Sequence, residues 1–173
     1  MKILGVDAST RCTGWCVLDN GKLIEYGKII PEDRDAEWRE RVLYMMRKVG
    51  KIAQTYNIDT IACETPVKTI KNVNTLEQLF TLGGTLMGIA AMLHINYCPV
   101  EVATWRKHFK LLDGIPAKEK DKRAILKQRS IELANETYNL ELQYVSPSSS
   151  RNDDDIADSI NIATYVDDVL NAK

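Results

Sequence analysis

The sequence predicts an α/β fold in which helices flank a five-stranded mixed sheet whose first three strands are antiparallel. Three short apolar runs near the N-terminus are joined by turn residues, which is typical of antiparallel hairpins. Beyond them, apolar runs alternate with helical periodicity, which is typical of parallel strands covered by helices. The right-handed crossover rule then places the fourth strand beside the first and parallel to it.

The N-terminal strands are predicted at residues 3–6, 14–18 and 22–30. Asp19-Asn20-Gly21 is a strong hairpin signal between the second and third strands, because asparagine and glycine readily adopt the positive φ angles of such turns. A bulge is expected at Gly27, since glycine inside a strand often marks one.

Helices are predicted at 37–56 and 74–93, where apolar residues recur every three or four positions. Strands are expected at 58–63 and 97–102. Two glycines, Gly83-Gly84, interrupt the second helix, and each costs about 1 kcal/mol relative to alanine. We therefore expect close backbone packing at that point.

The remaining residues predict a short helix capped by Thr104, a basic helix over 118–136, a polar loop over 141–153 and a last helix from about 154 to 170. The length of 173 residues fits a single domain spanning 1–173.

Composition predicts a soluble protein without a membrane segment, located in the cytoplasm. The chain is 45% apolar and 27% charged, and Asp7 interrupts the N-terminal apolar run too early for a secretory leader. The cysteines (Cys12, Cys16, Cys63 and Cys98) form no CxxC pair and are accompanied by only two histidines. This pattern favours reduced, packed thiols over a zinc site.

Charge is segregated along the chain. Residues 101–130 hold nine Lys and Arg against four Asp and Glu, whereas residues 131–173 hold two against nine. Solvated helix faces explain such runs, and so does an enzyme that binds a polyanion and brings a metal ion to it. Composition alone does not choose between these interpretations.

Carboxylates stand at positions that suit a ligand site. Asp7 and Glu64 end two strands predicted to be parallel neighbours, and ligands bind at that edge of an α/β sheet. Either acid alone could be structural, but two close carboxylates remain ionised only beside a cation. Asp155 and Asp158 share one face of the last helix, with Asp154 and Asp158 as a competing pair.

A site made of four carboxylates favours Mg²⁺ or Mn²⁺. Two such ions, about 3.5–4 Å apart, can activate water and stabilise the leaving oxygen of a phosphodiester. Trp105 and Phe109 have the spacing of core residues. The basic residues expected to neutralise backbone phosphates are Arg106, Lys107, Lys110, Lys118, Lys120, Lys122, Arg123, Lys127 and Arg129.

Three motifs, LGVDASTRCTGW, IACETP and DDDIADSINIA, resemble in order and spacing those of RuvC-like Holliday-junction resolvases. The resemblance implies a ribonuclease H-like fold, a homodimer and two-metal hydrolysis of DNA, with Asp7, Glu64, Asp155 and Asp158 as metal-binding acids. It also implies basic residues near the site, matching Arg106 or Lys107 and one or more of Lys118, Lys120 and Lys122.

The sequence departs from that pattern at two points. Ala8-Ser9 replaces the usual Pro-Gly, and Thr65-Pro66-Val67 lacks the phenylalanine that commonly enters the junction. The compact form resembles the phage-encoded branch, which implies that other branched DNA is also cut. With Val67 in place of an aromatic wedge, we expect little sequence preference.

The predicted function is a metal-dependent endonuclease acting on Holliday junctions and other branched DNA as a homodimer. The 74–93 helix is the candidate interface, with Gly83 and Gly84 allowing close approach, although core packing explains the same stripe. Three alternatives remain: a ribosomal-RNA-processing nuclease of the same fold, a non-catalytic junction-binding scaffold, and a sugar-kinase or actin-like ATPase fragment. The last is disfavoured by the chain length and by the lack of a second glycine-rich phosphate loop.

Overall fold

The computed structural model describes residues 1–65, 72–116 and 118–171. Five strands and five helices alternate much as predicted. The strands are β1 (Lys2–Ala8), β2 (Thr13–Asp19), β3 (Lys22–Ile29), β4 (Thr60–Thr65) and β5 (Asn96–Glu101). The helices are α1 (Trp38–Tyr56), α2 (Val73–Leu93), α3 (Val102–His108), α4 (Lys122–Tyr138) and α5 (Asp154–Asn171).

The strands form one sheet in the order β3-β2-β1-β4-β5. The first three are antiparallel neighbours, whereas β4 lies parallel to β1 and β5 parallel to β4, so the predicted topology is confirmed. The predicted bulge at Gly27 is wrong. The register between β2 and β3 shifts at Val17 and Leu18, while Gly27 lies against the indole of Trp15, its partner on β2.

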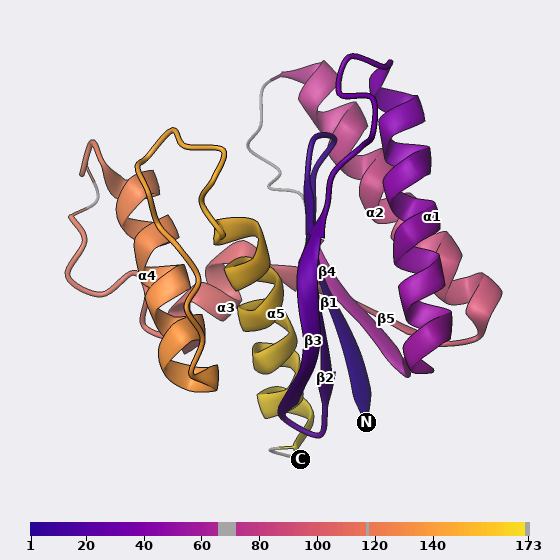
Figure 1. Cartoon of the computed structure of the whole chain (residues 1–173). Helices are drawn as coiled ribbons and strands as arrows, with labels where there is room; N and C mark the ends of the chain where they lie inside the picture. Colours follow the sequence, from indigo (N-terminus) through magenta and orange to yellow (C-terminus); the bar gives the residue numbers. More distant parts are fainter. Residues whose placement is uncertain (66–71, 117, 172–173) are drawn as a thin grey trace.

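Helices cover both faces of the sheet, with α3, α4 and α5 on one side and α1 and α2 on the other (Figure 1). Ile156, Ile160 and Ala163 of α5 are buried in the first core. Val42 and Met45 of α1 are buried in the second, which confirms the helical stripes read from the sequence. The four cysteines are free thiols, and Cys16 and Cys63 are buried.

Two glycines let α5 approach the sheet more closely than any other residue would allow. A Cβ atom on Gly14 would stand 1.9 Å from the carbonyl oxygen of Asp155, and one on Gly5 would stand 2.2 Å from that of Ser159. Since Gly14 pairs with Asp7 across the hairpin, this contact brings the first turn of α5 to the end of β1.

Three details of the helices differ from prediction, and the first is that α4 begins at Lys122 and not at residue 118. Thr104 caps nothing, because α3 begins earlier, at Val102, after Glu101. The expected backbone packing at Gly83-Gly84 is also wrong: among the described residues a Cβ atom on Gly84 would meet no atom within 4 Å, and one on Gly83 would stand 3.6 Å from the Tyr97 hydroxyl. Within the chain, side chains and not glycines join α2 to the sheet.

By length and composition alone, α2 could cross a membrane, and it is the one helix of the described residues that meets this test. In the fold it packs on the sheet through Leu82, Leu86 and Ala90. Its other face is exposed and carries Phe80, Met87 and Met92.

Candidate active site

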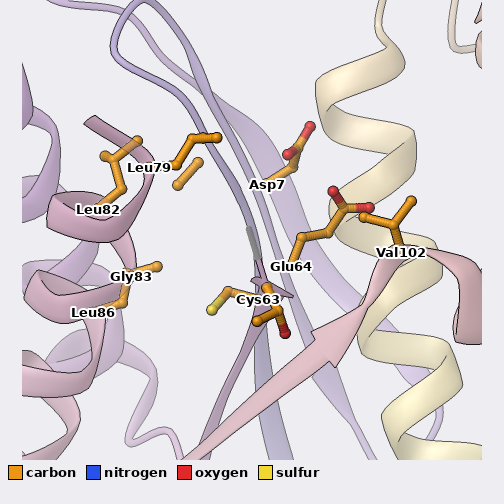
Figure 2. A pocket seen from close by; sticks show the side chains of 10 residues that line it. Asp7, Cys63, Glu64, Leu79, Leu82, Gly83, Leu86 and Val102 are labelled. Carbon is orange, nitrogen blue, oxygen red and sulfur yellow. The ribbon is translucent and has the colours of Figure 1, made fainter. Parts of the chain in front are cut away.

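Asp7 and Glu64 lie side by side at the ends of β1 and β4. The two strands are parallel, with Val6 opposite Cys63, so the next residue on each strand falls at the same edge of the sheet. Both acids line a cavity of about 140 Å³, opposite Leu82, Gly83 and Leu86 of α2 (Figure 2). The sequence-based pairing of these two carboxylates therefore describes their placement correctly.

Asp155 and Asp158, one turn apart on α5, approach the same edge. Burial raises the pKa of Asp7 well above its ordinary value, and the charges of Asp158, Glu64 and Asp155 raise it further. Burial is also the largest cause of the raised pKa of Glu64 and of Asp155. Four carboxylates are thus close enough to repel one another in a poorly solvated region.

Donors from α3 and α4 hold two of these acids. The indole Nε1 of Trp105 donates to Oε1 of Glu64 at 2.8 Å, and the Ser130 hydroxyl donates to Oδ1 of Asp158. Arg106 lies with Nη2 3.5 Å from Oδ2 of Asp158. Burial and the Glu64 charge raise the pKa of Asp158 to about 7, although Arg106 and the Ser130 hydrogen bond act in the opposite direction.

A second buried residue supports Ser130. The side-chain amide of Asn161 donates to the carbonyl oxygen of Ser130 at 3.0 Å and to its hydroxyl oxygen at 2.8 Å. Both residues are almost fully buried. Because the Ser130 hydroxyl accepts from Asn161, its own proton is directed to Asp158, so this pair fixes the orientation of the Asp158 carboxylate.

The remaining acids at the start of α5 have different partners. Asp154 pairs with Lys127 at 2.7 Å, and Asp153 pairs with Lys28 at 2.9 Å. Asp155 instead shares a hydrogen bond with the Cys12 thiol. The competing pair Asp154 and Asp158 is therefore less suited to a ligand site, because a lysine already compensates Asp154.

Carboxylate oxygens are the donors that Mg²⁺ and Mn²⁺ prefer, and four mutually repelling acids gain from a cation, so the residues fit such ions. Within the described residues, however, no three His, Cys, Asp or Glu side chains are gathered closely enough to hold an ion. Trp105, Ser130 and Arg106 each draw a carboxylate toward themselves. The acids line one region without forming a preassembled metal centre.

The predicted DNA-binding residues separate into two groups. Lys107, Lys110, Lys118, Lys120 and Arg123 are exposed, and Lys122 is half-buried. By contrast, Arg106 and Lys127 pair with acids of α5, and Arg129 donates to the carbonyls of Leu111 and Asp113. Trp105 is fully buried, as its spacing predicts. The expectation about Val67 concerns a residue outside those that the structure describes.

Sequence reasoning did not assign roles to Trp105, Ser130, Asn161 or Lys28 at this site. Ser130 and Asn161 could have been noticed as polar residues within apolar helical stripes. Gly5, inside an apolar strand, was a usable signal of close backbone approach. Nothing local indicates that Trp105 contacts Glu64.

The family described as Lactococcus phage M3 protein matches residues 1–168. The chain belongs to this family. No curated protein sequence matches the chain.

Solved structures show the same fold. Thermus thermophilus RuvC in complex with a Holliday junction substrate is 14% identical, covers 98% of this chain and 95% of its own, and has a TM-score of 0.70. The fowlpox virus resolvase in complex with Holliday junction DNA is 17% identical, and the match covers 98% of this chain and 99% of the resolvase, with a TM-score of 0.56. The yeast mitochondrial Holliday junction resolvase Ydc2 is 13% identical, and the match covers 94% of this chain and 75% of Ydc2, with a TM-score of 0.52. The predicted RuvC-like, ribonuclease H-like fold is confirmed.

Proposed function

We propose that the protein is a metal-dependent endonuclease that cleaves Holliday junctions and other branched DNA. The observation that carries the proposal is the meeting of Asp7, Glu64, Asp155 and Asp158 at one edge of the sheet, in a fold shared with Holliday-junction resolvases. Exposed lysines of α3 and of the segment before α4 supply the positive charge that DNA binding requires.

The four acids would hold two Mg²⁺ or Mn²⁺ ions, which activate water and neutralise the charge that develops on the phosphodiester. Asp7 and Glu64 contribute from adjacent strands, while Asp155 and Asp158 contribute from one face of α5. In this proposal Trp105 and Ser130 orient Glu64 and Asp158, and Arg106 moderates the negative charge of the site.

The protein would act as a homodimer, because the two symmetry-related strands of a four-way junction need two active sites in matching orientation. We place the interface on the outer face of α2, where Phe80, Met87 and Met92 are between 55% and 83% exposed. Gly84 and Gly88, four residues apart, face open space beside them and would allow a second helix to approach closely. The glycines that allow close approach are therefore Gly84 and Gly88, and not the predicted Gly83, which faces the sheet.

An adjoining groove of about 570 Å³ between α1 and α2 extends this apolar surface through Leu43, Met46 and Ile89. Neighbouring apolar side chains that are exposed together in this way are typical of a protein interface. We further propose that residues 1–173 act as one nuclease domain, in the cytoplasm and without a membrane attachment.

One experiment tests this function against its alternatives. Labelled four-way junctions, forks, linear duplexes and RNA–DNA hybrids are incubated with the protein in Mg²⁺, Mn²⁺ or EDTA. We expect metal-dependent cuts in the junction and, within about tenfold of its rate, in the fork. Binding without cutting would identify a scaffold, and cleavage confined to RNA would favour RNA processing. If the protein binds no nucleic acid, the proposed nuclease and the scaffold are both refuted.

A further inference from the structure

A second cavity, of about 280 Å³, is lined in part by Asp155 and shares no lining residue with the cavity beside α2. Its walls come from the β1–β2 turn, the end of β3 and the segment before α1. Four cationic residues line it, namely Arg11, Lys28, Arg34 and Arg41, against Asp155 as the one acid of the lining. Since a water molecule occupies roughly 30 Å³, the cavity has room for a phosphodiester group and several waters.

Two of these cations build the walls. Lys28 bonds to Asp153 and to the carbonyl of Asn152, which fixes β3 to the start of α5. Arg41 donates to the carbonyl of Thr10 at 2.8 Å and to those of Arg34 and Ala36, which ties the β1–β2 turn to the segment before α1. Both side chains are therefore satisfied by the protein itself.

The other two cations have no such partner. Arg11 and Arg34 are exposed, and neither forms an ion pair among residues 1–65, 72–116 and 118–171. Of the acids next to Arg34 in sequence, Glu32 accepts from Tyr44 and Asp33 accepts from backbone amides, while Asp35 forms no ion pair among the described residues. Two guanidinium groups are thus left to meet an anion, and guanidinium pairs with phosphate in a bidentate manner.

We propose that this cavity binds a backbone phosphate of the DNA, next to the phosphate under attack. The inference rests on the proposed function and deepens it. Asp155 lines the cavity and is also near enough to Asp7 for its charge to raise the pKa of Asp7, so an anion held by Arg11 and Arg34 lies within reach of the same strand that occupies the active site. The Cys12 thiol in the lining stays neutral, because burial and Asp155 raise its pKa to about 12.

This site is distinct from the basic residues of α3 and α4. Those residues cover the face of the sheet that carries α5, whereas Arg11 and Arg34 belong to loops beside β2 and α1 (Figure 1). DNA would therefore be held from both sides of the acids. The second contact fixes the strand's path across the metal site, which a single lysine-rich surface does not do.

The test measures binding of a synthetic four-way junction in the catalytically disabled Asp7→Asn background, with and without Arg11→Gln and Arg34→Gln. We expect each substitution to weaken binding about fivefold and to lower the slope of log affinity against log salt by about 0.9 per lost duplex phosphate contact. Lys22→Gln is the matched control. The substitution removes the same positive charge, and Lys22 is exposed at the opposite end of the β2–β3 hairpin. Thermal unfolding monitors folding of each variant.

A second readout locates the contact. Neutral methylphosphonates replace single phosphates along the cut strand, and one position near the cut should weaken binding in the Asp7→Asn parent while having no effect in the double Arg11→Gln, Arg34→Gln variant. If the parent binds the junction but both arginine variants match Lys22→Gln in affinity and salt slope, the cavity proposal is wrong and the proposed function stands. If the parent binds no branched DNA, the proposed function fails with it.

Discussion

The two faces of the sheet are built on opposite principles. The face under α5 buries several polar side chains among its apolar residues, including a hydrogen-bonded chain from Asn161 to Ser130 to Asp158. The face under α1 and α2 buries a core of apolar residues and leaves apolar residues on its outer surface as well. A polar interior stabilises less than an apolar one, so it is kept where charged groups must be oriented. An apolar exterior indicates a surface that packs against another protein.

The largest expected effect is on the α5 face. Asp7→Asn should slow cleavage by at least about a thousandfold, since in the proposed function it removes a ligand of ions that would supply several kcal/mol of transition-state stabilisation. Junction binding should remain, because the shape is unchanged. Initial rates on labelled junctions and binding in Ca²⁺ or EDTA measure the two quantities. A variant that cuts at the normal rate would contradict the site assignment.

Replacing one glycine on each side of the sheet by alanine should have opposite effects on stability. Gly14→Ala should destabilise the protein by about 1–3 kcal/mol or more and abolish cleavage, because its Cβ would meet the Asp155 carbonyl and displace α5. Gly50→Ala on α1 is the control, since its Cβ would make only a 3.9 Å contact with Ile89. There, replacement of a helical glycine should stabilise by about 1 kcal/mol. Urea denaturation of both variants gives the comparison, which fails if they respond alike.

A charged substitution on the outer surface of α2 should change the oligomeric state, whereas the same substitution at other exposed apolar positions should not. Met87→Glu should convert a dimer of twice 19.6 kDa into a monomer, because a carboxylate would be buried without a partner at the interface. Ile24→Glu on β3 removes a similarly exposed apolar side chain and should leave the mass unchanged. Light scattering at micromolar concentration distinguishes the outcomes. A monomeric parent protein, alone and on DNA, would contradict the assembly.

Sequence reasoning predicted what depends on local pattern. Asp7 and Glu64 could be paired because each ends an apolar strand and the crossover rule makes those strands parallel neighbours. The acids of α5 followed from helical spacing, but the sequence alone could not exclude Asp154, whose partner Lys127 lies on another helix.

The parts that sequence reasoning did not predict depend on contacts between distant segments. The β2–β3 irregularity falls at Val17 and Leu18 because of strand pairing, and no residue type marks it. Trp105 was correctly assigned to the core from its spacing, yet its hydrogen bond to Glu64 depends on how α3 packs against β5 and α5. Helix α2 is a similar case. Its apolar periodicity predicted the helix, but only the fold shows that Gly83 lies on the side of Tyr97 and Gly84 on the open side.

The carboxylates of the α5 face should make stability depend on pH. Their pKa values are raised in the folded state, and that of Asp158 is about 7, whereas unfolded Asp titrates near 4. Between these values the folded state binds more protons, so stability in EDTA should fall as pH rises from about 4 to 7. Mg²⁺ should restore more stability at pH 8 than at pH 5.

Thermal unfolding of the protein and of Asp158→Asn, at both pH values and with either EDTA or Mg²⁺, measures this effect. The variant lacks the group whose pKa is about 7, so its unfolding temperature in EDTA should change less between pH 5 and pH 8. Equal pH dependence in the two proteins would show that other groups control it.

The smallest effect should come from Ser130, which acts only through Asp158. Ser130→Ala removes the donor to the Asp158 carboxylate and leaves the Asn161 amide without its hydroxyl partner. Because that hydrogen bond lowers the pKa of Asp158, its loss should raise this pKa and move the rising limb of the cleavage-rate profile to higher pH. We expect a rate loss of about tenfold at pH 7 that shrinks at pH 9, since one hydrogen bond to a charged group contributes about 1.5–3 kcal/mol. Thr85→Ala, which removes a hydroxyl bonded within α2, is the control on the other face. A loss that is the same at every pH would mean that Ser130 supports packing alone and does not orient Asp158.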